Sequence, residues 1–350
     1  MSVQLITAAA ALEHWSSFGA IIDARSEAEY ALDHLPGAVN WPSLSNAQRV
    51  RVGTLYKQAG PFEAKKLGAA LVAANIARHI EQHVLEQSKS WQPLVYCWRG
   101  GKRSGALALV LDQIGFRVHQ LDGGYKAFRT EVRDQLQRLP QRLQWRVICG
   151  PTGSGKTRLL HALARQGAQV LDLEAIANHR SSVLGLIPGL PQPSQKRFET
   201  LLWQALRVLD AARPVFVEAE SKKVGNLAVP EALMHSIRSG ECLHLHLPDD
   251  ERVALLMEDY AFLYANPALL SQRLQALHAL RGAERIQAWQ ALIDQGHWDT
   301  LVRELLLHHY DPGYASSTRR NYSGFASAQM IAAQDRSPAS MDTLARALID

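Results

Sequence analysis

The chain of 350 residues has only three cysteines, Cys97, Cys149 and Cys242, and no Cys-x-x-Cys pair. This odd and widely spaced set argues against a disulfide framework and against a zinc site. No apolar run approaches the roughly 20 residues that a membrane-spanning helix needs. The start of the sequence also lacks a basic-then-apolar leader pattern. We therefore expect a cytoplasmic enzyme with no membrane partner, in surroundings that keep a catalytic thiol reduced.

The sequence also has no large excess of positive over negative residues. Lys and Arg number 38 against 33 Asp and Glu, which leaves a net charge of +5. This small excess permits a nucleic-acid partner but does not establish one, since a basic surface also keeps a protein in solution. The sequence has no internal repeat and no low-complexity segment. Its length exceeds that of one ordinary core, which favours two domains.

The stretch Leu94–Gly105, L-V-Y-C-W-R-G-G-K-R-S-G, is the most informative part of the first half. A short apolar strand brings Cys97 to its end, and an apolar helix is predicted from Ser104. At a helix N-terminus the thiol pKa should fall, so that the thiolate is the resting form. Gly100 and Gly101 allow successive N–H groups to form an anion-binding nest. Three cations surround them: Arg99, Lys102 and Arg103. The alternative is a buried structural cysteine beside a basic loop.

Further motifs follow one another around this loop. They are Ile22-Asp23-Ala24-Arg25 with Glu29-Tyr30, His34-Leu-Pro-Gly-Ala-Val-Asn40, Tyr96-Cys97, and Leu121-Asp122-Gly123-Gly124. Strands alternating with helices predict a parallel sheet with active residues at the carboxyl ends of its strands. With these motifs the first half resembles the rhodanese family, whose loop cysteine accepts sulfur or selenium. The resemblance implies that Asp23 and Arg25 brace the loop rather than react.

The loop departs from that family in one respect. Cys97 and Arg103 form a C-x5-R pattern, one residue longer than the loop common in sulfur-transferring rhodaneses. This spacing equals that of the cysteine phosphatases, so a phosphatase is a rival interpretation. A wider loop suits a tetrahedral anion, and selenophosphate is also such an anion.

A second site follows the predicted strand Trp145–Cys149. The octapeptide Gly150-Pro-Thr-Gly-Ser-Gly-Lys-Thr157 fits the phosphate-binding pattern G-x-x-x-x-G-K-T, and the helix Arg158–Arg165 comes directly after it. Backbone N–H groups of such a loop wrap phosphate oxygens, the lysine adds a mobile cation, and the threonine hydroxyl binds Mg²⁺. The residues assigned to diphosphate binding are Gly150, Gly153, Ser154, Gly155, Lys156 and Thr157, and Thr157 is also the candidate Mg²⁺ ligand.

Acidic residues end the two strands predicted next. Asp172 and Glu174 follow the strand Ala168–Asp172, while Glu218 and Glu220 follow Pro214–Val217. Carboxylates beside a phosphate loop position Mg²⁺ or a water molecule. Helix capping is the alternative for Asp172 and Glu174. The motif Asn178-His179-Arg180 supplies two further supporting candidates, His179 and Arg180.

These patterns give an α/β protein with two parallel-sheet domains. The predicted division is a rhodanese-like domain at 1–138, a linker at 139–144, a P-loop α/β domain at 145–248, and a helical appendage and tail at 249–350. The helical pattern runs to about His309, and Arg319-Arg320 lies in the polar tail.

With both halves in place, nearly the whole chain is similar to the bacterial tRNA 2-selenouridine synthase family. The additional shared motifs are Asn178-His179-Arg180, Gln192-Pro-Ser-Gln195, Glu218-Ala-Glu-Ser221 and His309-Tyr-Asp-Pro312. The resemblance implies a transferase that acts on the wobble 2-thiouridine in the anticodon arm of tRNA. Geranyl diphosphate first alkylates the sulfur, and selenium from selenophosphate then replaces the S-geranyl group to give 2-selenouridine.

This resemblance divides the roles between the two sites. Cys97 would handle selenium, and selenophosphate would bind to Arg99, Gly100, Gly101, Lys102 and Arg103. The P-loop would bind geranyl diphosphate rather than ATP, because its Gly-Pro-Thr-x-Ser-Gly-Lys-Thr form also resembles the loop of tRNA prenyltransferases. Three other functions stay open: a cysteine phosphatase, a P-loop small-molecule kinase, and a non-catalytic sulfur-relay or tRNA-binding module.

Overall fold

The computed structural model describes residues 2–182 and 184–349 of the chain. Two compact units make up the molecule, Met1–Gln135 with Pro193–Gln204, and Leu136–Gln192 with Ala205–Asp350. Within the described residues, no helix combines the length and the apolar character that crossing a membrane requires.

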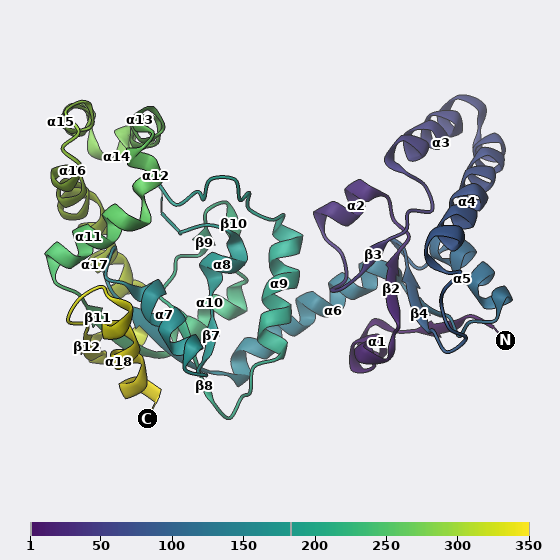
Figure 1. Ribbon diagram of the computed structural model, residues 1–350, viewed down its shortest axis with the longest axis horizontal. Coiled ribbons are helices and arrows are strands. Elements are labelled where there is room, and N and C mark those ends of the chain that lie inside the picture. The colour runs from purple at the N-terminus through teal and green to yellow at the C-terminus, as the bar shows by residue number, and fades with distance from the viewer. Residues whose placement is uncertain (1, 183, 350) are drawn as a thin grey trace. The chain divides into compact units, whose positions relative to one another are not determined.

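A five-stranded, fully parallel sheet forms the centre of the first unit (Figure 1). Its strand order is β1-β5-β4-β2-β3, with β1 at Gln4–Ile6, β2 at Ala20–Asp23, β3 at Val39–Asn40, β4 at Pro93–Tyr96 and β5 at His119–Leu121. All four residues of β4 are buried, as expected for a central parallel strand. The parallel sheet predicted from the sequence is confirmed. Strand β1 was not predicted, because two of its three residues are exposed and no apolar pattern marks it.

Helices cover this sheet. They are α1 (Ala8–Glu13), the short 3₁₀ turn η1 (Trp15–Ser17), α2 (Glu27–Leu32), α3 (Asn46–Ala59), α4 (Pro61–His83), α5 (Lys102–Ile114) and α6 (Gly124–Arg138). Leu107, Ala108 and Leu111 of α5 pack against Ile22 and Val95 of the sheet. Helix α5 begins at Lys102, two residues before the predicted start at Ser104, so two of the loop cations lie in its first turn.

The first ten residues of α9 (Gln195–Arg207) also belong to the first unit. Trp203 is fully buried, and its ring meets the Phe128 ring edge-on at 5.5 Å between centroids. Arg129 of α6 donates a hydrogen bond to Thr200 Oγ1 at 2.9 Å and pairs with Glu199. The predicted division at 139–144 placed this segment in the P-loop domain and is wrong for 193–204. A helical period shows that a face is apolar, but not which core receives it.

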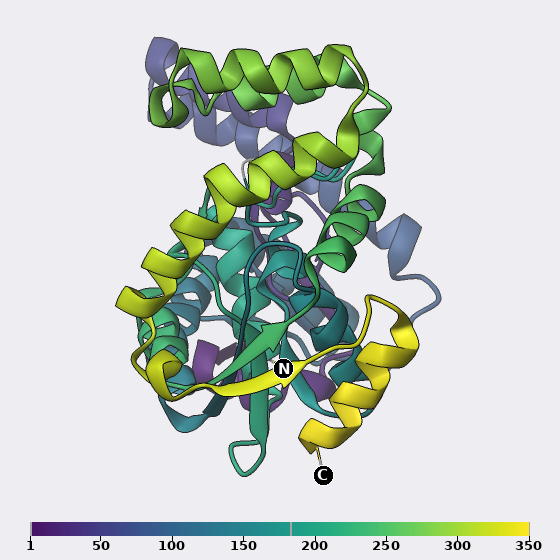
Figure 2. The ribbon, with the colours of Figure 1, turned by 90° about the vertical axis from the view of Figure 1, so that its left-hand side faces the viewer.

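The second unit contains another five-stranded parallel sheet. Its order is β12-β11-β6-β8-β7, with β6 at Gln144–Cys149, β7 at Gln169–Leu171, β8 at Pro214–Glu218, β11 at Glu241–His246 and β12 at Gln329–Ala332. An antiparallel pair, β9 (Lys223–Val224) and β10 (Leu227–Ala228), lies outside this sheet. Figure 2 shows β12 in yellow beside β11. The polar tail predicted beyond about His309 is therefore wrong, since this segment contains a helix with Arg319-Arg320 and an edge strand of the P-loop sheet.

The helices of this unit fall into two groups. Those nearest the sheet are η2 (Leu139–Arg142), α7 (Lys156–Arg165), α8 (Leu173–Ala177), α10 (Glu231–Arg238), η4 (Ser323–Ser327) and α18 (Pro338–Ile349). A helical region follows β11, and it comprises α11 (Asp249–Asp259), α12 (Ala261–Tyr264), α13 (Pro267–Gln275), α14 (His278–Arg281), α15 (Ala283–Asp294), α16 (Trp298–Leu305), the π-helical turn η3 (Leu306–Tyr310) and α17 (Asp311–Asn321). This region was predicted as helical, and most of it has a core of its own around the fully buried Trp289.

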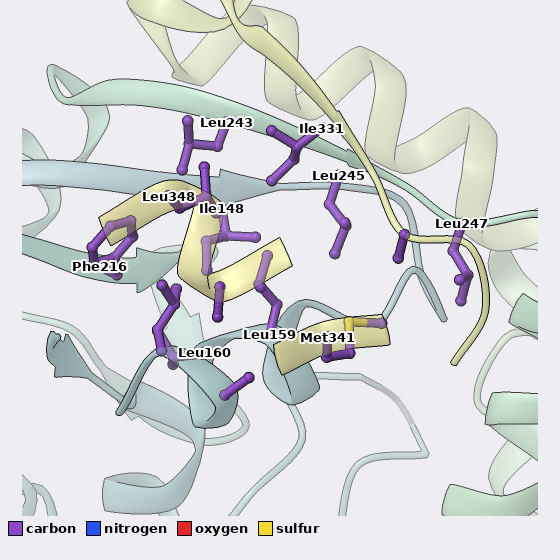
Figure 3. Packing of buried hydrophobic residues seen from close by; sticks show 14 of the residues in the cluster. Ile148, Leu159, Leu160, Phe216, Leu243, Leu245, Leu247, Ile331, Met341 and Leu348 are labelled. Atoms are coloured by element: carbon purple, nitrogen blue, oxygen red, sulfur yellow. The ribbon is translucent and has the colours of Figure 1, made fainter. Parts of the chain in front are cut away.

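The core under the P-loop joins residues that are far apart in the sequence. Figure 3 shows Ile148 of β6, Leu159 of α7, Leu243 of β11, Ile331 of β12 and Met341 of α18 in one cluster. The last two come from the segment that was predicted as tail. The P-loop is therefore held by packing that only the complete second unit provides.

Candidate functional site

Cys97 follows β4 directly and precedes the first turn of α5. The Ser104 hydroxyl donates a hydrogen bond to Cys97 Sγ at 3.1 Å. Burial raises the pKa of the thiol, but that hydroxyl and the backbone N–H groups of Ser104, Arg99 and Gly101 lower it by more, so the pKa of Cys97 lies below its ordinary value. The predicted direction is confirmed. Hydroxyl and N–H groups, rather than guanidinium charge, are its main cause.

Gln120 of β5 supports this arrangement from behind. Its Nε2 donates hydrogen bonds to Ser104 Oγ at 3.1 Å and to the Gly100 carbonyl at 2.6 Å. The side chain therefore fixes both the serine that contacts the thiol and the turn of the loop. Sequence reasoning did not select Gln120 or Ser104. The one signal in the sequence was the position of Gln120, a polar residue in the middle of a strand predicted to be buried.

The loop itself requires glycine at position 100. Gly100 has φ of +64°, and a Cβ there would lie 2.5 Å from the Leu121 carbonyl oxygen. The Cys97 and Trp98 carbonyls accept hydrogen bonds from the N–H groups of Tyr125 and Lys126 at 2.8 and 3.0 Å. The loop is thus fastened to the start of α6 and approaches it too closely for a side chain.

The three predicted anion-binding cations differ in their surroundings. Arg103 pairs with Glu29 at 2.8 Å, and Arg49 pairs with the same carboxylate at 3.0 Å. Burial raises the pKa of Glu29, but the hydrogen bond and charge of Arg103, the Ser26 N–H and the charge of Arg49 together outweigh it and leave the pKa lowered. Arg99 and Lys102 are exposed on the loop and in the first turn of α5. They are the two cations best placed to meet an incoming anion.

Asp23 and Arg25 form a buried ion pair behind the loop, with 2.6 Å between Nη2 and Oδ2. Arg25 is 1% exposed, lies 3.9 Å from the centroid of the Tyr125 ring, and donates to the Asp33 carbonyl at 2.6 Å. The Tyr96 hydroxyl donates to Asp23 at 2.7 Å. Both oxygens of Asp23, and Nε and Nη2 of Arg25, are engaged by the protein, which is the geometry of a brace.

Access to the thiol is restricted. Cys97 is only 3% exposed, whereas Arg99 and Gly101, which follow it in the loop, are exposed. An anion therefore meets the exposed residues of the loop at 99–102 before it meets Sγ. Gly100 and Gly101 give that part of the backbone its freedom.

An open hollow lies beside the loop within the first unit. It is lined by Arg25, Glu29, Leu32, Arg49, Trp98, Arg103, Tyr125 and Lys196. Lys196 of α9 places its ammonium group 5.6 Å from the centroid of the half-buried Trp98 ring. An aromatic face flanked by cations suits a nucleobase and its phosphates. Lys196 escaped the sequence analysis because its segment was assigned to the other domain.

The P-loop connects β6 to α7 in the second unit, as predicted from the sequence. Gly155 has φ of +86°, and a Cβ there would lie 2.7 Å from Met341 Cε. The Lys156 ammonium donates hydrogen bonds to the carbonyls of Gly150 at 2.8 Å and Pro151 at 3.3 Å. The lysine thus folds back over its own loop, where a bound phosphate would compete for it.

Three glutamates gather near Lys156. Burial and the negative charge of Glu218 together raise the pKa of Glu174 to about 9 and that of Glu220 to about 7. Burial also raises the pKa of Glu218, whose carboxylate accepts a hydrogen bond from the Thr157 hydroxyl. All three line the hollow above the P-loop. Such a cluster stores repulsion that a cation would relieve.

The donor set fits a magnesium ion bound together with a diphosphate. Glu218 Oε1 and Ser154 Oγ are buried without a hydrogen-bond partner. In residues 2–182 and 184–349, no group of three His, Cys, Asp or Glu side chains is arranged to hold a metal. Mg²⁺ commonly takes only one or two protein ligands and fills its octahedron with phosphate oxygens and water. Thr157 and Glu218 are the residues that would hold it.

The other predicted supporting residues lie in different places. Asp172 caps α8, accepting a hydrogen bond from the Ala175 N–H at 2.8 Å, and lies 2.8 Å from His161 Nε2. Its capping alternative is thus the observed role. His179 is buried but is not among the residues that line the P-loop hollow, whereas Arg180 is.

Residues that sequence reasoning missed complete the P-loop hollow. Tyr260, Tyr310 and Tyr314 present three rings to it. The Tyr314 hydroxyl accepts a hydrogen bond from the Gly150 N–H. Arg252 donates to the Thr152 carbonyl at 2.9 Å and pairs with Asp311 at 2.6 Å, which ties the loop to α17. These contacts come from the helical region, where the sequence analysis named Tyr310 and Asp311 as part of a shared motif but assigned them no role.

Comparison with known proteins agrees with this architecture. Residues 7–131 match the family described as "Rhodanese-like domain", and residues 143–280 match the "tRNA 2-selenouridine synthase AAA domain". The tRNA 2-selenouridine synthase of Hydrogenovibrio crunogenus is 32% identical over 335 residues, covering 84% of this chain and 88% of that protein. The chain belongs to the tRNA 2-selenouridine synthase family. The α/β fold class predicted from the sequence is confirmed with it.

Two further relatives carry the same name. The protein of Nitrosomonas europaea is 38% identical, and the match covers 69% of this chain and 63% of that protein. The protein of Nitrosomonas eutropha is 35% identical, and the match covers 78% of this chain and 71% of that protein. The match to the first of them thus spans less than two thirds of that relative. Among solved structures, a rhodanese-related protein from Thermoplasma volcanium is 16% identical over 37% of this chain and 92% of that chain, with a TM-score of 0.25.

Proposed function

We propose that this protein converts the wobble 2-thiouridine of tRNA to 2-selenouridine in two steps, S-geranylation followed by selenation. The observation that carries the proposal is the pair of anion sites in one chain. One is a thiol of lowered pKa at a helix N-terminus, and the other is a P-loop whose hollow is walled by tyrosine rings. Neither site alone accounts for a change of chalcogen on a base.

The P-loop serves the first step in this proposal. The thiouridine sulfur attacks C1 of geranyl diphosphate, so that the S–C1 bond forms as the C1–O bond breaks and diphosphate leaves. Lys156 and the loop N–H groups neutralise that leaving group. Mg²⁺, held by Thr157 and Glu218, would add charge neutralisation. The rings of Tyr260, Tyr310 and Tyr314 stabilise positive charge that develops on the allylic carbon.

The Cys97 loop serves the second step. Arg99, Lys102 and the loop N–H groups bind the phosphate part of selenophosphate beside the thiol. Selenium adds to C2 of the base, geranylthiol leaves, and water takes the phosphoryl group, so the products are 2-selenouridine, geranylthiol and phosphate. Alkylation is what turns the sulfur into a leaving group. The order of the two steps follows from that requirement.

The tRNA enters through the hollow beside the loop. Trp98 and Lys196, whose ammonium group lies 5.6 Å from the centroid of the Trp98 ring, would contact an unstacked base and its phosphate. Recognition of the anticodon arm would then require a single-stranded, splayed uridine. That expectation suits a wobble position, where the base is not held in a duplex.

The experiment is a reconstitution with reagents omitted one at a time. Purified protein is incubated with 2-thiouridine tRNA, geranyl diphosphate and selenophosphate, and the nucleosides are weighed by mass spectrometry. We expect Cys97→Ala to geranylate but not selenate, and Lys156→Ala to fail at geranylation while still selenating tRNA that is already geranylated. Full selenation in the absence of any prenyl diphosphate would refute the two-step scheme.

The same samples test the rival functions. A small-molecule kinase would hydrolyse or transfer phosphate from a nucleotide, and a tRNA-binding module would leave the nucleoside unchanged. A cysteine phosphatase would release phosphate from an aryl phosphate. The pairing of Arg103 with Glu29 argues against this last function, because the arginine of a C-x5-R loop must be available to the phosphate.

A further inference from the structure

We propose that a narrow apolar cavity next to the P-loop receives the hydrocarbon chain of the prenyl diphosphate and limits its length. This inference rests on the proposed geranylation step and deepens it. It assigns a role in substrate choice to the helical region between α11 and η3, where sequence analysis found no chemistry.

The cavity and the P-loop hollow are adjacent and share part of their lining. Both are lined by Thr152, Ser182, Leu256, Tyr260 and Tyr310. Thr152 belongs to the P-loop itself, and its carbonyl is held by Arg252. The chain of a ligand whose diphosphate lies on the P-loop would therefore reach the cavity by passing between Leu256 and the two tyrosines.

Beyond this junction the lining is hydrocarbon apart from Tyr264. The walls are leucines of α12, α13 and α16, and Leu263, Leu270 and Leu301 are each no more than 2% exposed. A ribose and a base would leave their hydrogen-bonding groups without partners there, which costs a polar ligand most of its affinity. An isoprenoid chain loses nothing by entering and gains the removal of apolar surface from water.

The rings at the junction fit the reacting end of such a chain. Tyr260 and Tyr310 line both spaces, and the Tyr260 hydroxyl lies 3.3 Å from Ser182 Oγ. This contact turns the polar edge of the ring toward the serine. The allylic carbon, which gains positive charge as diphosphate departs, would pass between aromatic rings at this point.

The size of the two spaces indicates a limit on chain length. The P-loop hollow has a volume of about 260 Å³, whereas the apolar cavity has about 40 Å³. In this proposal the diphosphate and the first isoprene unit lie in the former, and the next unit would enter the latter once leucine side chains rotate. A third unit would have to displace Leu270 and Leu301 from the core around Trp289. We therefore expect geranyl chains to be accepted and farnesyl chains to be rejected.

The test compares dimethylallyl, geranyl and farnesyl diphosphate, which differ by one isoprene unit each, on 2-thiouridine tRNA. Leu301→Ala enlarges the far end and should raise the ratio of farnesyl to geranyl kcat/KM by about tenfold or more. Leu301→Phe fills it and should lower the geranyl value by a similar factor while leaving the dimethylallyl value within about twofold. The matched control is Leu277→Ala, a buried leucine of the same helical core outside the cavity lining, which should leave both ratios unchanged.

A binding measurement on the unaltered protein tests the same inference without depending on the folding of a variant. Geranyl diphosphate should displace a fluorescent diphosphate at a concentration at least about tenfold below that of inorganic diphosphate, because only the former fills the cavity. Equal displacement, or chain-length ratios that do not respond to either Leu301 variant while geranylation proceeds, would overturn this inference and leave the proposed function intact. Lack of any prenyl transfer by the unaltered protein would overturn both.

Discussion

The Ser104 hydroxyl lies 3.1 Å from the Cys97 sulfur. Ser104 is in the first turn of α5, and Gln120 of β5 donates a hydrogen bond to its Oγ. The acidity of the thiol therefore depends on two residues that do not themselves meet substrate. A helix residue and a strand residue together prepare the sulfur for reaction.

Ser104→Ala should move the reactivity of Cys97 to higher pH. The pKa of the thiol is lowered in the folded protein, so thiolate is present above that lowered value, and loss of the hydroxyl donor raises it. The measurement is the rate of Cys97 alkylation by iodoacetamide against pH. Ser90→Ala, at an exposed position, is the control. An unshifted profile would contradict the role assigned to Ser104.

Gly100→Ala should destabilise the protein by about 1–3 kcal/mol. The position has φ of +64°, and the added Cβ would meet the Leu121 carbonyl oxygen at 2.5 Å. Gly101→Ala is the matched control, since its Cβ would have no atom within 4 Å and its φ is −97°. Urea unfolding of the full chain measures both. Equal midpoints for the two variants would show that the close approach is not a constraint.

Glu220→Gln should stabilise the protein at alkaline pH. The pKa of Glu220 is raised by burial from 4.5 to about 7, so the folded state favours the protonated form. Its contribution to the free energy of unfolding is complete below pH 4.5 and is lost as the pH rises to 7, by on the order of 3 kcal/mol. The neutral amide removes that loss.

Unfolding of both proteins between pH 5 and pH 8.5 measures the effect. Glu231→Gln, which changes an exposed acid of α10, supplies the reference. The assignment fails if Glu220→Gln and Glu231→Gln have the same dependence on pH.

Arg252→Ala should impair the first step and spare the second. Arg252 holds the Thr152 carbonyl of the P-loop at 2.9 and 3.1 Å and pairs with Asp311 of α17. Loss of these contacts should raise KM for geranyl diphosphate by about tenfold, since a hydrogen bond to a charged group is worth about 1.5–3 kcal/mol. Selenation of tRNA that already carries the geranyl group should stay within about twofold. Arg285→Ala, with its ion pair to Glu304 on the neighbouring helices, is the control.

Lys196→Ala should weaken tRNA binding about threefold to tenfold at low salt. The ammonium group stands over Trp98 beside the Cys97 loop, and both line the same hollow. Filter binding of 2-thiouridine tRNA at several salt concentrations measures the loss. Lys223→Ala removes an exposed lysine of the other unit and should have a smaller effect. Equal losses for both would reduce Lys196 to one of many surface charges.

The sequence placed both loops within two residues of their observed positions. The loops from β4 to α5 and from β6 to α7 contain glycines and cations and connect a strand to a helix. Such signals lie within a few residues of one another, so they can be recognised in the sequence. Strand β12 has no comparable mark, because only Ile331 of its four residues is buried and its partner β11 lies far away in the chain. Local patterns cannot show a pairing of that kind.

The side chains that the sequence did not reveal share one property. Gln120, Lys196 and Tyr314 reach the two loops from elements distant in the chain, and nothing around them differs from an ordinary strand or helix. Their contribution arises from tertiary packing, which no periodicity encodes. The sequence motifs thus identified Cys97 and the P-loop, whereas the side chains that contact these loops are brought there by the fold.

The return of the chain to the first unit at 193–204 affects how this protein is made. After Gln135 the ribosome must add the intervening residues 136–192 before the last helix of the first unit begins to emerge. At about 5–20 residues per second, that interval lasts on the order of 3–11 s. Until then Phe128 lacks the Trp203 ring, and the nascent first unit presents an apolar face to chaperones.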